Sequence, residues 1–458
     1  MAYPSDAKPE LDVRPLRASG QVYLDYTGAA LYSEALLREH TEILTRQLFG
    51  NPHSAHQASL ASTFAAGVAR EAVFHFLDAD HHDYEIVWTA NASSALRLVG
   101  DAFPFGPAAP FVLTADNHNS VNGIRQLARA GGAPVTYLPL DDELRVRPFE
   151  LPRVERGLFA YPAQSNFSGV RHPLDWIDSA QRRGYTVLLD AAAFVPTSPL
   201  SLREVRPDFV ALSIYKICGY PTGIGALIGR HDALRALVRP SFAGGSVEFV
   251  SVMSDRHQLK TGSEGFEDGT GNFLAWSGVP PALQMIERLG MPSIHAHVDA
   301  LTAQALAAMA SVRHANGNPA VWIHGPAEMR DRGGTIAFNL VDEAGRVIDH
   351  EHVVDAAAYA GICLRGGCFC NPGAAEHAFR YQAGELAAAL DAVADHFSIA
   401  AMRVALNNKP VGAVRASLGY ASTASDVQAL VAFLEDFACR SGKVDSQTEL
   451  PVEGRRKP

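Results

Sequence analysis

One lysine of the sequence stands where a reactive amine would be expected. Lys216 follows the apolar run FVALSI and precedes a glycine-rich segment, in SIYKICGYPTGIGALIG. An ammonium at the end of a buried strand is costly to desolvate unless it is paired or takes part in chemistry, and Schiff-base lysines occupy such positions. The alternative is a lysine whose charged end reaches solvent from the strand end. The glycines fit neither a dinucleotide-binding fingerprint nor a P-loop.

A carboxylate ends another apolar run about one strand–helix unit earlier. Asp190 closes TVLLD, and in open α/β sheets ligands bind at the carboxyl ends of parallel strands. A buried carboxylate there could keep the nitrogen of a pyridine ring protonated, so that the ring can accept electrons. Because three alanines follow it, Asp190 would suit a helix N-cap equally well.

Three further segments place polar groups after apolar runs. WTANASSALRLV has the form of a strand, a turn of small residues and a helix, so its amides and Ser93 could hold a phosphate at a helix N-terminus. SNFSG and DNHNSV supply Asn166 and His118. Each of these two could equally be a turn residue or a solvated imidazole.

The segment LRGGCFCNPG carries two cysteines one residue apart, Cys368 and Cys370, in a loop bounded by glycines and preceded by Arg365. This pattern fits a thiolate nucleophile or a metal site, and a buried inert thiol is the third alternative. Zinc would need a second ligand pair, which neither Cys363 nor His377 completes. The pattern therefore favours a reactive thiol, and we expect no metal.

Composition favours small-molecule chemistry. The chain has 458 residues, 47% of them hydrophobic and 19% charged, with a net charge of -10. It can bury a large core in more than one domain, and neither nucleic acid nor a membrane surface is indicated as a partner. The polar, proline-rich N-terminus resembles no signal peptide and no stretch could span a bilayer, so a cytoplasmic protein is expected. Five cysteines, an odd number, favour free thiols over disulfides.

The apolar runs alternate with amphipathic stretches such as SALRLVGDAF and WIDSAQRRG until about Ile228. This rhythm predicts βαβ units and a mainly parallel sheet covered by helices. From about Pro292 the pattern indicates a smaller α+β domain. We therefore predict four regions: an N-terminal arm (1–30), a large domain (31–291), a small C-terminal domain (292–440) and a disordered tail (441–458).

Eight segments, taken in order, resemble the class V aminotransferase and cysteine desulfurase superfamily, and within it the N-terminal desulfurase domain of molybdenum cofactor sulfurases. They are YLDYTGAALY, GNPHS, NHNSVNGIR, LLDAAAFVPTSPL, SIYKICGYPTGIGALI, FEDGTGNFLA, LRGGCFCNPG and VRASLGY. The resemblance implies an α/β protein of the pyridoxal 5'-phosphate (PLP) transferase fold type I. Such a protein has a mainly parallel seven-stranded sheet and a smaller α+β domain.

The resemblance also implies roles at the cofactor. Lys216 would carry PLP, Asp190 would face the pyridine nitrogen, and His118 would stack on the ring. Asn166 resembles the donor to the phenolic oxygen and also a substrate-binding residue. The remaining implied cofactor contacts are Ala92 (through its amide), Ser93, Ser213, Tyr215, Gly269 and Thr270. Gly269 and Thr270 match a loop that reaches the phosphate of a neighbouring subunit, so a homodimer is expected.

Two arginines match substrate-binding positions. Arg415, in VRASLGY, resembles the residue that binds the substrate carboxylate, a bidentate task that suits guanidinium. Arg365 precedes Cys370 by the family's spacing, which favours Cys370 over Cys368 as the nucleophile. The implied reaction converts L-cysteine to L-alanine and leaves a persulfide on Cys370, whose sulfur then passes to an acceptor.

The sequence departs from the common desulfurase pattern at two places. Tyr215 replaces a histidine and Ala193 replaces a polar partner of the cofactor ring; both replacements suit the sulfurase branch. Fused sulfurases continue into a further domain for which this chain has no residues, so the sequence does not identify the sulfur acceptor. It also leaves open selenocysteine or a cysteine conjugate as substrate. The alternatives are another class V PLP enzyme, namely an aminotransferase, an epimerase or a C–S lyase, or a non-catalytic scaffold that delivers or receives sulfur within a complex.

Overall fold

The central sheet of the computed structural model has seven strands in the order β2-β8-β7-β6-β5-β3-β4. β8 runs antiparallel to both of its neighbours and the other pairs are parallel. The strands are β2 (Tyr84–Thr89), β3 (Phe111–Thr114), β4 (Val135–Leu138), β5 (Gly157–Pro162), β6 (Tyr185–Asp190), β7 (Phe209–Ser213) and β8 (Gly225–Arg230). The predicted fold class is confirmed. The structure describes residues 19–238 and 244–441.

Both faces of this sheet are covered, which explains why its central strands are continuous apolar runs. Every residue of β5 and β7 is buried. Along β5, Leu158 and Ala160 join the cluster that contains α4 (Ala92–Ala102) and α6 (Ile124–Ala130), whereas Phe159 and Tyr161 join the cluster on the other face. That second cluster includes residues of α3 (Gln57–Phe76), α7 (Trp176–Gln181), α11 (Val279–Leu289) and α12 (Met291–Ser311).

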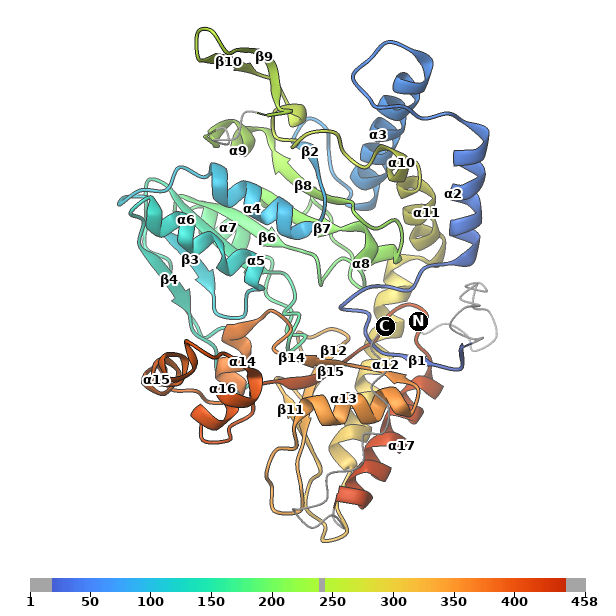
Figure 1. The fold of residues 1–458 in the computed structure, drawn as a ribbon, viewed down its shortest axis with the longest axis vertical. Coiled ribbons are helices and arrows are strands. Elements are labelled where there is room, and N and C mark those ends of the chain that lie inside the picture. The colour runs from blue at the N-terminus through green and yellow to red at the C-terminus, as the bar shows by residue number, and fades with distance from the viewer. Residues whose placement is uncertain (1–18, 239–243, 442–458) are drawn as a thin grey trace.

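A second, antiparallel sheet of four strands lies beside the first in the order β11-β12-β15-β14 (Figure 1). Its strands are β11 (Val321–His324), β12 (Thr335–Leu340), β14 (Arg365–Gly367) and β15 (Ala413–Ser417), and its neighbours in Figure 1 include α13 (His350–Tyr359) and α17 (Ala424–Ser441). All four strands fall within the predicted small domain. The domain boundaries themselves stay a prediction, and the tail beyond residue 441 and the start of the arm lie outside the described residues.

The N-terminal segment packs against this second sheet. β1 (Val22–Tyr23) pairs in parallel with β13 (Ile362–Cys363), and Asp25 forms an isolated bridge with Ser417 of β15. The arm therefore reaches the place where the two sheets meet.

The remaining elements complete the described chain. The hairpin of β9 (Val247–Ser251) and β10 (Arg256–Leu259) projects from the end far from the second sheet (Figure 1). The other helices are α2 (Glu34–Arg46), α5 (Asn119–Asn122), α8 (Ile214–Cys218), α9 (His231–Ala236), η1 (Ser263–Gly265), α10 (Phe273–Trp276), α14 (Pro372–Ala378), α15 (Ala383–Val393) and α16 (Ile399–Ala405). Within the described residues, no helix combines the length and apolar character needed to cross a bilayer.

Candidate active site

A cavity of about 480 Å³ opens at the carboxyl ends of the central strands. This edge of an open α/β sheet is where ligands bind. The residues predicted for the site that line this cavity are Ala92, Ser93, His118, Asn166, Asp190, Ser213, Tyr215 and Lys216. The fold thus brings together side chains from five separate segments of the sequence.

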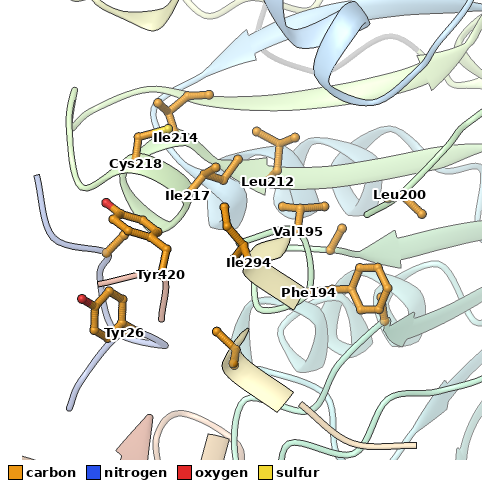
Figure 2. Packing of buried hydrophobic residues seen from close by; sticks show 14 of the residues in the cluster. Tyr26, Phe194, Val195, Leu200, Leu212, Ile214, Ile217, Cys218, Ile294 and Tyr420 are labelled. Carbon is orange, nitrogen blue, oxygen red and sulfur yellow. The ribbon is translucent and has the colours of Figure 1, made fainter. Parts of the chain in front are cut away.

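Lys216 lies on the short helix α8, directly after β7. Figure 2 shows Ile214, Ile217 and Cys218 of this helix in the buried cluster that also contains Tyr420. α8 ends at Gly219, which has a φ of 73° and where a Cβ would lie 2.5 Å from the carbonyl carbon of Leu31. Packing on both sides therefore fixes the backbone that presents the lysine to the cavity.

The amine of Lys216 is available for chemistry. Within residues 19–238 and 244–441 it makes no ion pair or hydrogen bond, so it is not an ordinary paired lysine. Burial lowers the pKa of Lys216, and the carboxylate of Asp190 opposes this shift. A lowered pKa increases the fraction of neutral amine, which is the form that attacks a carbonyl group.

Asp190 ends β6 and is buried. Its Oδ1 accepts a hydrogen bond of 3.0 Å from the amide of Ala192, the type of contact that a helix-capping residue would make. The residue also lines the cavity. The capping contact uses Oδ1, which leaves Oδ2 to face a ligand.

His118 lies on the loop after β3, where its Nδ1 accepts a hydrogen bond of 3.1 Å from the amide of Ser120. Nε2 is then the nitrogen that carries the proton of the neutral ring. Burial lowers the pKa of His118; Asp190 opposes this shift, whereas Lys216 and Arg415 add to it. The imidazole is therefore neutral at neutral pH and can accept or donate one proton.

The N-terminus of α4 forms the polar end of the cavity. The amide of Ala92 donates to Ser213 Oγ at 2.8 Å, and Ser93 Oγ lies 2.6 Å from Ser120 Oγ. A Cβ at Gly225 would lie 2.4 Å from Asn91 Cα, so glycine lets β8 approach this turn. A helix N-terminus with hydroxyl groups beside it suits an anion such as phosphate.

Asn166 joins the cavity to the cysteine loop. Its Nδ2 donates to the carbonyl of Phe369 at 2.7 Å, and its Oδ1 accepts from Asn371 Nδ2 at 2.9 Å. The amide that we predicted as a donor to the cofactor thus bonds to the cysteine loop in this structure. A role at the phenolic oxygen stays a prediction.

Cys370 is exposed, on the turn between β14 and α14. Phe369 and Cys370 have φ values of 56° and 54°, a left-handed conformation that is unfavourable for residues other than glycine. The carbonyl of Cys370 accepts a hydrogen bond of 2.6 Å from the amide of Asn119. Cys368 instead packs against an apolar cluster that includes Phe369. This arrangement supports the choice of Cys370 over Cys368.

Metal ligation of the two cysteines finds no support in the described residues. Among residues 19–238 and 244–441, no group of three or more His, Cys, Asp or Glu side chains is placed to hold a metal ion.

Arg415 and Arg365 both bind Asp25. Arg415 is 2% exposed; it donates to Asp25 Oδ1 and to the carbonyl of Asn166, each at 3.0 Å, and packs over the ring of Phe369. Arg365 directs Nε and Nη2 at the same carboxylate. Asp25 stands in the motif YLDYTGAALY, but no role was predicted for it.

Three further residues of the site were not predicted: Ser120, Gln164 and Asn371. Ser120 and Gln164 line the cavity, and Asn371 bonds to Asn166. Ser120 stands two residues after His118 in DNHNSV, so its proximity to the site could have been expected. Gln164 carries no comparable signal.

Gly269 and Thr270 lie apart from the cavity. They are exposed, on the loop between η1 and α10, and are not among the residues that line it. Their predicted contact with a neighbouring subunit stays a prediction.

The chain is similar to known proteins over most of its length. It is 34% identical to a molybdenum cofactor sulfurase of Solanum lycopersicum, over 96% of this chain and 58% of the relative. It is also 34% identical to the molybdenum cofactor sulfurase of Homo sapiens, over 92% of this chain and 50% of the relative. The chain thus spans between half and three fifths of the length of these two relatives.

Solved structures share the fold. An apo cysteine desulfurase from Thermococcus onnurineus NA1 superposes with a TM-score of 0.77 at 24% identity, covering 96% of this chain and 99% of that one. The cysteine desulfurase CsdA from Escherichia coli gives a TM-score of 0.70 at 24% identity, covering 93% of this chain and 98% of that one. The family model described as Aminotransferase class-V matches residues 22–430. The chain therefore belongs to the class-V aminotransferase family.

Proposed function

We propose that this chain is a PLP-dependent cysteine desulfurase, which converts L-cysteine to L-alanine and carries the sulfur as a persulfide on Cys370. The observation that carries the proposal is the amine of Lys216, which lacks a partner in the described residues and shares one cavity with Asp190 and His118. The likeness to molybdenum cofactor sulfurases supports a sulfur-transfer reaction.

The residues that line the cavity fit this cofactor. The N-terminus of α4, with Ser93 and Ser213, would hold the phosphate. Asp190 would keep the pyridine nitrogen protonated, and His118 would stack on the ring. When bound, PLP supplies an electron-accepting ring that stabilises negative charge on the substrate.

Lys216 has two tasks in this proposal. Its Nζ would hold PLP covalently. The neutral amine, whose fraction a lowered pKa increases, would also take the proton from the substrate Cα.

Cys370 would act as the thiolate. Its Sγ attacks the substrate sulfur, a new S–S bond forms, and the bond between that sulfur and the substrate Cβ breaks. The electron pair stays on Cβ, which takes up a proton to become the methyl group of alanine. His118, neutral and beside the cavity, is placed to remove the proton of the substrate thiol.

Two variants test the proposal. Lys216→Ala should lack the visible absorption of lysine-bound PLP and produce no alanine. Cys370→Ala should bind PLP but accumulate no protein persulfide from L-cysteine, as measured by mass spectrometry. Cys439→Ala is the matched control, because Cys439 is exposed on α17, and it should form persulfide like the wild type. Release of sulfide by Cys370→Ala at the wild-type rate would instead indicate a C–S lyase that needs no thiol.

A homodimer is part of the proposal. Leu60, Phe64 and Val68 are exposed at four-residue intervals along α3 and form an apolar stripe, and such stripes often mark subunit contacts. The sulfur acceptor is proposed only as a protein or cofactor that receives sulfur from Cys370. The cytoplasmic location and the absence of nucleic-acid and membrane partners stay predictions.

A further inference from the structure

Two arginines lie side by side on neighbouring strands of the second sheet. Arg365 of β14 and Arg415 of β15 are paired residues in the antiparallel register. Like charges directly opposite each other on neighbouring strands repel. Arg415 is almost fully buried, so water does little to screen this repulsion. An opposite charge is needed to offset it.

The carboxylate of Asp25 lies between them. Its Oδ1 accepts from Arg415 Nη2 at 3.0 Å, and its Oδ2 accepts from Arg365 Nε at 2.9 Å and from Arg365 Nη2 at 2.5 Å. Hydrogen bonds in which both groups are charged are among the strongest in proteins. One carboxylate thus fixes the orientation of both arginines.

Asp25 is itself held firmly. Its carbonyl accepts hydrogen bonds from the amides of Gly28 and Ala29 at 3.0 and 3.2 Å, and the residue forms a bridge with Ser417. A Cβ at Gly28 would lie 2.6 Å from Asp25 Oδ2 and 2.7 Å from Arg365 Nη2, so the chain folds closely over the ion pairs. The carboxylate therefore has little freedom to move away from the arginines.

Among the described residues, one nitrogen of the Arg415 guanidinium has no hydrogen-bond partner. Nη1 bonds to the carbonyl of Asn166 and Nη2 bonds to Asp25. Nε is buried and has no hydrogen-bond partner in the part of the chain that the structure describes. A buried donor without a partner is unfavourable in a folded protein.

We infer that Asp25 is a positioning residue for substrate recognition. It holds the guanidinium of Arg415 in the orientation that binds the α-carboxylate of the substrate, and Arg365 acts through Asp25 instead of contacting the substrate. This inference rests on the proposed function, in which Arg415 binds that carboxylate. It changes the role of Arg365 from a substrate contact to a support.

The test compares two ligands of the holoenzyme that differ in the carboxylate. L-Alanine carries one and ethylamine does not, and both can be titrated through the visible absorbance of the bound cofactor without turnover. We expect Asp25→Asn to reduce the preference for L-alanine over ethylamine by about tenfold, since it removes one charge-assisted contact of Arg415. With L-cysteine, KM should rise more than kcat falls. The matched control is Asp436→Asn, which removes an exposed partner of Arg440 and should leave the preference unchanged.

The outcomes separate the inference from the function on which it rests. A purely structural defect in Asp25→Asn would weaken both ligands equally and would overturn the inference, as would a stronger preference for L-alanine. Arg415→Gln must also lower the preference; if it does not, the proposed carboxylate contact fails. If Arg415→Gln lowers the preference for L-alanine and Asp25→Asn does not, only the role of Asp25 is refuted.

A second variant serves if Asp25→Asn does not fold. Arg365→Gln removes the group that holds Asp25, and its side chain is 51% exposed, so folding should tolerate the change. It should lower the preference for L-alanine by about threefold, because Asp25 keeps its contact with Arg415. An unchanged preference would mean that Arg365 does not act through Asp25.

Discussion

The left-handed turn at Cys370 makes a prediction about stability that is independent of catalysis. Cys370 has a φ of 54°. This conformation costs an alanine about 1–2 kcal/mol and costs glycine almost nothing. The thiol is exposed, so its removal loses little buried surface. Comparing Cys370→Gly with Cys370→Ala therefore isolates the backbone conformation.

The expected magnitude follows from two opposing effects. Glycine avoids the cost of the left-handed conformation but loses more backbone entropy on folding than alanine, by about 0.5–1 kcal/mol. Cys370→Gly should therefore have a free energy of unfolding higher than that of Cys370→Ala, by up to about 1.5 kcal/mol. At Gly67, in the middle of α3 with open space around its Cα, the order reverses. There, Gly67→Ala should stabilise the protein by about 1 kcal/mol.

The assay is unfolding in urea, monitored by circular dichroism, of the wild type, Cys370→Gly, Cys370→Ala and Gly67→Ala. Opposite signs at residues 370 and 67 would support a fixed left-handed turn in the folded protein. If alanine were the more stable residue at both positions by the same amount, Cys370 would not adopt this conformation, and the proposed rigid presentation of its thiol would be wrong.

Three further predictions concern the site and the assembly. The pKa of Lys216 is lowered from its ordinary value of 10.5. The rate at which PLP binds to the apo protein, followed by visible absorbance, should therefore rise with pH and reach a plateau below pH 10.5. A rate that still increases at pH 10.5 would contradict a lowered pKa. Gly28→Ala would place a Cβ 2.6 Å from Asp25 Oδ2. It should cost about 1–3 kcal/mol in urea unfolding and weaken L-alanine binding, whereas the Gly67→Ala protein should bind normally. Phe64→Glu on the exposed stripe of α3 should shift the mass measured by light scattering from dimer to monomer; a wild-type protein that is already monomeric would refute the homodimer.

Parallel-sheet topology explains why much of the cavity could be predicted from the sequence. Asp190, His118 and Lys216 each follow a buried apolar run. The carboxyl ends of parallel strands meet at one edge, so these side chains were expected to lie close together. The structure places all three in one cavity.

Other parts of the site depend on tertiary contacts that carry no local pattern. Asp25 meets Arg415 across 390 positions of sequence, and the pairing of the N-terminal segment with β13 and β15 brings them together. The bond from Asn166 to the carbonyl of Phe369 likewise depends on how the two sheets meet. The contacts of Gly269 and Thr270 would depend on a second subunit.

The most direct measurement of the central claim is to locate the cofactor on the chain. Borohydride reduction of the purified holoenzyme makes the bond between PLP and its lysine permanent, and mass spectrometry of the peptides then identifies the residue. We predict the pyridoxyl phosphate label on Lys216. A label on Lys260 or Lys409, or a protein that purifies with no label after incubation with PLP, would contradict the account.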